Sequence, residues 1–158
     1  MAAAINYEQL NTLNAAYARC IDDDQLEAWP DFFTEDCLYK VTTADNHREG
    51  LEAGMIYADS RGMLQDRVAA LREANVYERQ SYRHITGAPF IVSSDAAAAS
   101  VETPFIVARI MRGGKTDVFA TGKYLDRIVA DEAGRLRFAE RIVVCDSVAV
   151  DTLLAIPL

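Results

Sequence analysis

The chain has 158 residues, which fits one domain over residues 1–158, and its 51% apolar and 25% charged residues are the balance of a globular protein rather than a disordered one. The net charge of −8 argues against binding to duplex nucleic acid, because such binding needs Lys and Arg to neutralise phosphates. The N-terminus lacks the cationic and apolar regions of a secretory signal, and no window approaches the roughly 20 apolar residues of a membrane helix.

The N-terminal part of the chain is predicted to form helices. Asn6 and Gln9 have the spacing of a capping box, and apolar residues follow it at intervals of three and four: Leu10, Leu13, Tyr17 and Cys20–Ile21. The acidic run Asp22–Asp24 ends this helix, and Asp24 with Glu27 is expected to cap a second helix, which Pro30 kinks or shortens. The run resembles a metal-binding loop, but it lacks the glycine and the downstream glutamate of a calcium loop, so a helix boundary is favoured.

Two strands and a third helix are predicted next. Residues 37–42 form the first strand and residues 55–58 a second, short one, with a polar stretch between them. The third helix is expected to begin after Ser60 and to end near Asn75, with an apolar face that consists of Leu64, Val68 and Leu71.

From Tyr82 onward the chain is predicted to form a sheet. Turn-like segments separate four long strands, at roughly residues 82–93, 98–112, 115–130 and 135–147. In the third of these, Gly122 is expected to form a bend or bulge, and alternation places Asp126 on one face with Val118, Ala120, Tyr124 and Ile128. In the fourth, Glu140 and Asp146 share a face with Leu136, Phe138, Ile142 and Val144. Helices followed by antiparallel strands make an α+β domain.

The sequence offers few residues for metal or nucleotide chemistry. The two histidines, His47 and His84, lack the spacing of a zinc site and cannot supply both a Rieske cluster and a mononuclear iron site. The cysteines Cys20, Cys37 and Cys145 are odd in number and far apart, which is typical of buried free thiols in a reducing compartment, so we expect a cytoplasmic protein. The chain contains neither a phosphate-binding loop nor a G-x-S-x-G motif.

Acid–base chemistry is the one kind of catalysis that the residues leave open. If the strand face of Asp126 lines a closed cavity, desolvation would raise its pKa and make it a general acid or base. The favoured alternative is an ion pair between Asp126 and a neighbouring arginine, for which the candidates are Arg127, Arg137 and Arg141. A lone histidine such as His84 is more often a structural hydrogen-bonding residue than a catalyst, and Glu140 and Asp146 carry the same ambiguity as Asp126.

Five segments in a fixed order resemble the β, or small, subunits of aromatic-ring-hydroxylating dioxygenases, the Rieske non-haem iron oxygenases. They are residues 24–39 (DQLEAWPDFFTEDCLY), 63–75 (MLQDRVAALREAN), 82–85 (YRHI), 122–128 (GKYLDRI) and 140–146 (ERIVVCD). The resemblance extends from about Leu10 to Leu158. Within the family, subunits of enzymes that oxidise terephthalate look most similar, with salicylate and anthranilate as alternatives, on the stretches 45–46, 49–50, 58–60, 76–79 and 151–153.

The resemblance implies a fold like that of nuclear transport factor 2 and ketosteroid isomerase, in which a strongly curved antiparallel or mixed sheet wraps as a cone around N-terminal helices. It also implies a structural subunit with no catalytic, cofactor-binding or metal-binding residues, in an α3β3 hexamer with β–β contacts. The α subunit would carry the Rieske [2Fe–2S] cluster and a mononuclear Fe(II), and a separate reductase would deliver electrons from a nicotinamide nucleotide.

Two questions stay open at this point. A cofactor-free isomerase or dehydratase is the alternative function, with Asp126 and His84 moving protons inside the cone and Tyr17 as a hydrogen-bond donor. The apolar residues Leu153, Leu154 and Ile156 are expected either to close the cone or to join an exposed apolar patch of the kind that large permanent interfaces bury.

Overall fold

Helices and one mixed sheet make up the computed structural model, which describes residues 2–52, 54–74, 79–147 and 156–158. The elements in chain order are α1 (Tyr7–Asp22), the 3-10 helix η1 (Leu26–Phe32), β1 (Phe33–Thr43), α2 (Ala44–Arg48), β2 (Ile56–Ala58), α3 (Arg61–Ala74), β3 (Gln80–Thr86), β4 (Phe90–Ser94), β5 (Ala98–Met111), β6 (Thr116–Ala130) and β7 (Leu136–Cys145). This order confirms the predicted α+β class. In the described ranges, no helix is long and apolar enough to cross a membrane.

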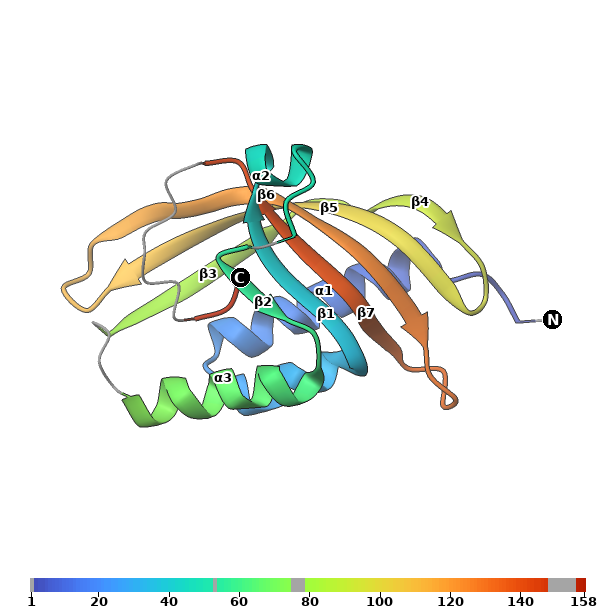
Figure 1. Cartoon of the computed structure of the whole chain (residues 1–158), viewed down its shortest axis with the longest axis horizontal. Helices are drawn as coiled ribbons and strands as arrows, with labels where there is room; N and C mark the ends of the chain where they lie inside the picture. Colours follow the sequence, from blue (N-terminus) through green and yellow to red (C-terminus); the bar gives the residue numbers. More distant parts are fainter. Residues whose placement is uncertain (1, 53, 75–78, 148–155) are drawn as a thin grey trace.

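The sheet has the strand order β2-β1-β7-β6-β5-β3, and β4 pairs with β5 beside β3. Only the pair β1–β7 is parallel among the described strands, and the other pairs are antiparallel, so the predicted mixed sheet is confirmed. The long strands curve across α1, which lies on the inner face of the sheet, while α3 lies next to η1 and β1 (Figure 1). The core therefore lies between α1, η1 and the inner sheet face.

Two helix starts agree with their sequence signals. At the start of α1, the Asn6 side chain accepts a hydrogen bond from the Gln9 backbone, and the Gln9 side chain accepts one from the Asn6 backbone, each 3.0 Å long. This reciprocal pair is the predicted capping box. The Ser60 hydroxyl accepts a 3.2 Å bond from the Met63 backbone at the start of α3, as predicted. The predicted end of α3 at Asn75 lies outside the described residues.

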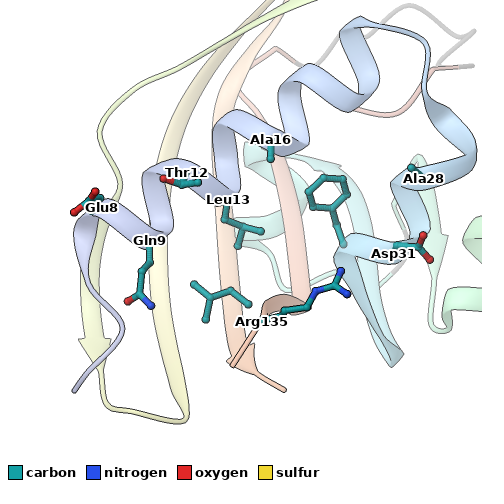
Figure 2. A pocket seen from close by; sticks show the side chains of 10 residues that line it. Glu8, Gln9, Thr12, Leu13, Ala16, Ala28, Asp31 and Arg135 are labelled. Atoms are coloured by element: carbon teal, nitrogen blue, oxygen red, sulfur yellow. The ribbon is translucent and has the colours of Figure 1, made fainter. Parts of the chain in front are cut away.

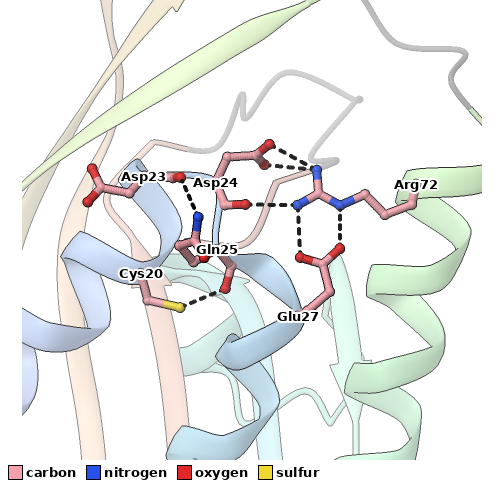
Figure 3. Close-up of polar contacts among 6 residues, drawn as sticks. All are labelled: Cys20, Asp23, Asp24, Gln25, Glu27 and Arg72. Carbon is pink, nitrogen blue, oxygen red and sulfur yellow. Dashed lines mark hydrogen bonds and ion pairs between the residues drawn. The ribbon is translucent and has the colours of Figure 1, made fainter.

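The second predicted helix is a 3-10 helix without a side-chain cap, so the predicted Asp24–Glu27 capping pair is wrong. Asp24 has a φ of +59°, and both carboxylates instead contact Arg72 of α3 (Figure 3). Arg72 binds Asp24 through Nη1 at 2.9 Å and Glu27 through Nε at 2.7 Å. Sequence spacing predicts a local cap here because it does not reveal the contact with Arg72, which lies 48 residues from Asp24 along the chain.

The strand predicted over residues 82–93 is two strands, β3 and β4, separated by residues 87–89. Both pair with β5, and the break lies opposite Pro104, which has no backbone N–H to donate to a neighbouring strand. The Gly87 N–H donates to the Pro104 carbonyl at 2.9 Å, and a Cβ on Gly87 would lie 2.7 Å from the Pro104 ring. The short helix α2 was also not predicted, because its residues form a polar stretch without an apolar stripe.

Bulges change which residues of β6 and β7 face the core. Opposite β5, Phe119 is the extra residue of β6, and Val118 is consequently 69% exposed rather than inward-facing as predicted. Opposite β6, Ala139 is the extra residue of β7, so Arg141 replaces Glu140 and Ile142 on the inner face. The prediction that Glu140, Ile142 and Val144 share a face with Phe138 is therefore wrong.

Gly122 does not form the predicted bulge, because its pairing with Phe105 on β5 is regular. Gly122 matters because the main chain of β7 passes very close to it. A Cβ at this position would lie 2.0 Å from the Val144 carbonyl oxygen, which real Cβ contacts never show. Glycine is needed here for space between two main chains.

Candidate functional site

The centre of the inner sheet face holds a buried arginine where the dehydratase-like alternative would need a cavity. Arg141 of β7 is fully buried, and its guanidinium lies 3.8–4.3 Å from the centroids of three aromatic rings: Tyr17, Tyr124 and Phe138. The rings come from α1, β6 and β7. A guanidinium is attracted to the negative face of an aromatic ring, so this ring cage stabilises the positive charge inside the core.

Asp126 is the carboxylate partner of Arg141, as the favoured ion-pair prediction stated. Arg141 Nε donates to Oδ1 and Nη2 donates to Oδ2, both at 2.8 Å, and neither side chain is exposed. Burial raises the pKa of Asp126, and the adjacent Arg141 charge opposes that rise. Both carboxylate oxygens of Asp126 therefore bind the guanidinium inside the core.

The ion pair is tied to the helix and to β5 by two more buried side chains. Asn14 of α1 accepts a 2.7 Å hydrogen bond from Arg141 Nη2 and donates a 3.2 Å bond to the Thr103 hydroxyl of β5. Asn14 and Thr103 are 2% and 0% exposed. This chain of contacts joins α1, β5, β6 and β7 through polar groups that are satisfied mainly by one another.

The end of the chain occupies the inner face next to this network. The hydroxyls of Tyr17 and Tyr39 both donate to the Leu158 carbonyl, at 2.7 Å and 3.0 Å, and the Leu158 N–H donates back to the Tyr39 hydroxyl at 3.1 Å. Leu158 is fully buried and Ile156 is 7% exposed. The sequence predicts that this segment either closes the cone or joins an exposed apolar patch. The burial of Ile156 supports closure of the cone, while Leu153 and Leu154 lie outside the described residues. The Tyr17 hydroxyl is therefore bound to the Leu158 carbonyl, and burial raises the pKa of Tyr17.

His84 is bound by the first residue of the acidic run. Its Nδ1 lies 2.6 Å from Asp22 Oδ1, and its backbone N–H donates to Asp22 Oδ2 at 2.9 Å. Both side chains are almost fully buried, with exposures of 0% and 3%. The pair fastens the end of α1 to the outer strand β3, which is the structural role that the sequence favoured for His84.

The other polar candidates lie apart from one another. Glu140 is half-buried on the outer sheet face, Asp146 accepts a hydrogen bond from Thr121, and His47 lies in α2. All three cysteines are buried free thiols, as predicted. Within the ranges that the structure describes, no group of three or more His, Cys, Asp and Glu side chains has the geometry to hold a metal ion.

A groove on the outside of α1 has a volume of about 640 Å³ (Figure 2). Its floor consists of Leu13, Ala16, Ala28, Phe32 and Leu136, and its rim carries Glu8, Asp31 and Arg135. A second hollow of about 480 Å³, toward Asp23, shares Ala16, Ala28 and Phe32 with it. Neither of these two hollows is lined by Asp126, His84 or Tyr17. A third hollow of about 490 Å³ is lined by Asp126 and Glu140 but not by His84 or Tyr17, so these three candidates do not converge on any of the three.

Sequence reasoning missed three parts of this centre: Asn14, Asp22 as the partner of His84, and Leu158. A signal existed for Asn14, because it follows Leu10 at i+4 and precedes Tyr17 at i+3, on the apolar stripe of α1. A polar residue on such a stripe indicates a buried hydrogen-bond partner. Asp22 and Leu158 gave no local signal, since their partners are 62 and at least 119 residues away.

Comparisons with known proteins identify the family of the chain. The family model described as the ring hydroxylating β subunit matches residues 16–152. The terephthalate 1,2-dioxygenase terminal oxygenase β subunit 1 of a Comamonas species is 58% identical over 98% of this chain and 99% of its own. The anthranilate 1,2-dioxygenase small subunit of Burkholderia cepacia is 37% identical, over 95% of this chain and 92% of its own.

A solved structure gives the same result. The crystal structure of a β subunit ascribed to an aromatic-ring-hydroxylating dioxygenase of Novosphingobium aromaticivorans superposes with a TM-score of 0.88, at 39% identity and with 96% of both chains covered. The sequence and the fold are thus those of one group of proteins. The chain belongs to the family of β subunits of aromatic-ring-hydroxylating dioxygenases.

Proposed function

We propose that this chain is the structural, non-catalytic β subunit of the terminal oxygenase component of a terephthalate dioxygenase. The observation that carries the proposal is the filled inner face: Asp126 is bound to Arg141, His84 to Asp22, and Tyr17 to Leu158. Each residue considered for proton transfer therefore has a structural partner. The 58% identity to the Comamonas terephthalate subunit over nearly both full chains supports the choice of substrate, with anthranilate and salicylate enzymes as the nearest alternatives.

The proposal assigns the redox chemistry to the partner α subunit. That subunit carries the Rieske [2Fe–2S] cluster and the mononuclear iron, and a reductase supplies its electrons. The β subunit, a single domain over residues 1–158, joins three α and three β subunits into a cytoplasmic α3β3 hexamer. The possible metal ligands of this chain support this division of roles between the subunits. Its two histidines and three buried cysteines do not meet at one place in the described residues.

Co-expression with an α subunit of a terephthalate dioxygenase tests the proposal. We expect the two chains to co-purify, the mass of the intact complex to equal three copies of each, and terephthalate-dependent oxygen consumption to require the α subunit and reductase. The iron and acid-labile sulfide should follow the α subunit, and the β chain purified alone should contain neither. Iron bound stoichiometrically to the isolated β chain, or a β chain that never binds an α subunit, would contradict the proposal.

The isomerase or dehydratase alternative has its own test. If Asp126 or His84 moved protons in a cofactor-free reaction, the purified chain alone would convert a small aromatic or polyketide-like compound, and Asp126→Asn or His84→Gln would abolish that activity. We expect no such activity from the purified chain. Turnover by the chain alone that either substitution removes from a folded variant would favour a catalytic role.

A further inference from the structure

Residues 156–158, which we call the tail, lie on the inner face of the sheet in the way that a bound ligand does. All three are buried, and Leu158 is 0% exposed. The Leu158 carbonyl oxygen accepts hydrogen bonds from the Tyr17 hydroxyl at 2.7 Å and from the Tyr39 hydroxyl at 3.0 Å. The Leu158 N–H donates to the Tyr39 hydroxyl at 3.1 Å. An apolar group beside an oxygen that several donors bind is the pattern of a small-molecule site.

Two further hydrogen-bond donors lie at the same place. Within the described ranges, Trp29 Nε1 and Arg141 Nη1 are buried and have no acceptor in hydrogen-bonding distance. The pKa of Tyr17 is raised by burial and lowered by Arg141 and Trp29, which places both residues beside the Tyr17 hydroxyl. Buried donors are normally paired, so two unpaired ones call for an explanation. This part of the inner face therefore holds more donors than the single Leu158 carbonyl oxygen satisfies.

Aromatic rings surround these donors. Trp29, Phe33 and Tyr39 contact one another edge to face, with ring centroids 5.1–5.7 Å apart, and all three are buried. Such a cluster accepts a further planar ring, because edge-to-face pairs of aromatic groups attract each other. The Asp126 carboxylate binds the Nε and Nη2 atoms of Arg141, which leaves Nη1 for another acceptor. The site thus combines aromatic walls with donors that lack an anion.

We propose that the surroundings of the Leu158 carbonyl form a binding site for a small aromatic monocarboxylate, and that the tail occupies this site when no such ligand is bound. One carboxylate oxygen takes the place of the Leu158 carbonyl oxygen between the two tyrosine hydroxyls. The other reaches Trp29 Nε1 and Arg141 Nη1, and the ring replaces the Leu158 side chain. A carboxylate fits better than a neutral carbonyl group, because hydrogen bonds to an ionised acceptor are roughly twice as strong. The inference concerns this chain alone and does not rest on the proposed function.

Competition with the tail determines how tightly the ligand binds. The ligand binds only to molecules whose tail has left, so the apparent dissociation constant is the intrinsic one divided by the fraction of such molecules. The effective concentration of a tethered segment is on the order of millimolar, so wild type should bind the ligand weakly. A weaker tail should give tighter binding. Leu158→Ala weakens the tail, because it removes most of the apolar side chain that the site buries.

Fluorescence titration of the full-length chain with benzoate tests the site, since Trp29 is the only tryptophan. We expect Leu158→Ala to bind benzoate at least about tenfold more tightly than wild type. Leu10→Ala, which removes the same side chain from another buried position, is the matched control and should bind as wild type does. Adding Tyr17→Phe to Leu158→Ala should weaken binding at least about tenfold, whereas adding Tyr7→Phe, at an exposed position, should not.

Benzamide separates a carboxylate site from a merely apolar one. It has the ring and one oxygen of benzoate but no charge, so it should bind to Leu158→Ala at least about tenfold more weakly. Equal affinity of Leu158→Ala for benzoate and benzamide would overturn the inference. Equal affinity of wild type and Leu158→Ala for benzoate would overturn it as well, because the tail would then not occupy the site.

Hydrogen exchange in wild type gives a second test, which stands even where Leu158→Ala does not fold. The Leu158 N–H is bound to the Tyr39 hydroxyl, so its exchange rate reports how often the tail leaves. Benzoate, compared with chloride at equal concentration, should accelerate this exchange at least about tenfold and leave the amides of β6 unchanged. If the Leu158 N–H exchanges at the same rate in benzoate and in chloride, the tail and the ligand do not compete and the inference is wrong.

Discussion

Arg141 of β7 and Asp126 of β6 are cross-strand partners that bind each other through two 2.8 Å hydrogen bonds, with no part of either side chain exposed. Taking two charges out of water costs several kcal/mol per ion, so contacts inside the core must offset that cost. Asn14 and the ring cage supply part of that compensation. The pair is accordingly a structural requirement of the inner face.

Asp126→Asn is expected to destabilise the chain by about 3–5 kcal/mol, because it leaves a buried guanidinium without its counter-charge. Urea unfolding followed by circular dichroism measures the change. Asp126→Leu combined with Arg141→Met should recover most of the loss, since apolar residues of similar volume replace both charges. Glu132→Gln, in the exposed β6–β7 turn, is the matched control for loss of one carboxylate. A fully stable Asp126→Asn variant would mean that the pair is not a structural requirement.

Gly122→Ala is expected to be among the most damaging single substitutions. The new Cβ would lie 2.0 Å from the Val144 carbonyl oxygen, and relief requires β6 and β7 to move apart. We expect little soluble protein, or a loss of at least about 3 kcal/mol in urea unfolding. Gly113→Ala is the control, because nothing lies within 4 Å of its Cβ position. Equal stability of the two variants would show that the strands at Gly122 adjust freely.

The sequence predicted those elements whose signals are local. The capping box at Asn6, the cap at Ser60 and the apolar stripe of α1 each depend on residues within four positions of one another, and all three are present. The predicted ends of β5, β6 and β7 also agree with the structure to within two residues, because turn residues mark them.

The features that the sequence did not reveal depend on partners far along the chain. The bulges at Phe119 and Ala139 reverse the inward and outward alternation, and neither residue type marks a bulge. Arg141 was therefore one of three possible partners of Asp126, and only the Ala139 bulge turns it inward. Glu27 faces Arg72 instead of capping a helix for the same reason, since α3 packs on η1 only in the folded chain.

The Tyr39 hydroxyl is expected to hold the last residue of the chain more firmly than the Tyr17 hydroxyl does. Tyr39 both donates to the Leu158 carbonyl and accepts from the Leu158 N–H, whereas Tyr17 only donates. Tyr39→Phe should therefore cost about 1–3 kcal/mol, because it leaves a buried N–H unpaired, and Tyr17→Phe should cost less. Leu158→Ala should cost about 2–5 kcal/mol through loss of buried volume.

Thermal unfolding of these three variants, with Tyr7→Phe as the exposed control, measures the order of the effects. If Leu158 and Tyr39 stabilise the inner face, Leu158→Ala and Tyr39→Phe lower the thermal unfolding midpoint clearly more than Tyr7→Phe does. If all variants unfold with wild type, the contacts with Leu158 do not stabilise the cone.

The buried thiols give a pH dependence of defined sign. Burial raises the pKa of Cys20 and of Cys145 from 9.0 to about 11, so the folded chain retains their protons where the unfolded chain loses them. This contribution to stability is fully present below pH 9 and is lost between pH 9 and 11. In urea unfolding at pH 8 and pH 10.5, a C20A/C145A variant should therefore lose less stability on going to high pH than wild type does.

Because the thiolate is the reactive form, a disulfide reagent at pH 8 should modify the three cysteines only after unfolding. Rapid modification of the native chain, or identical pH dependence of variant and wild type, would show that the thiols are accessible to solvent.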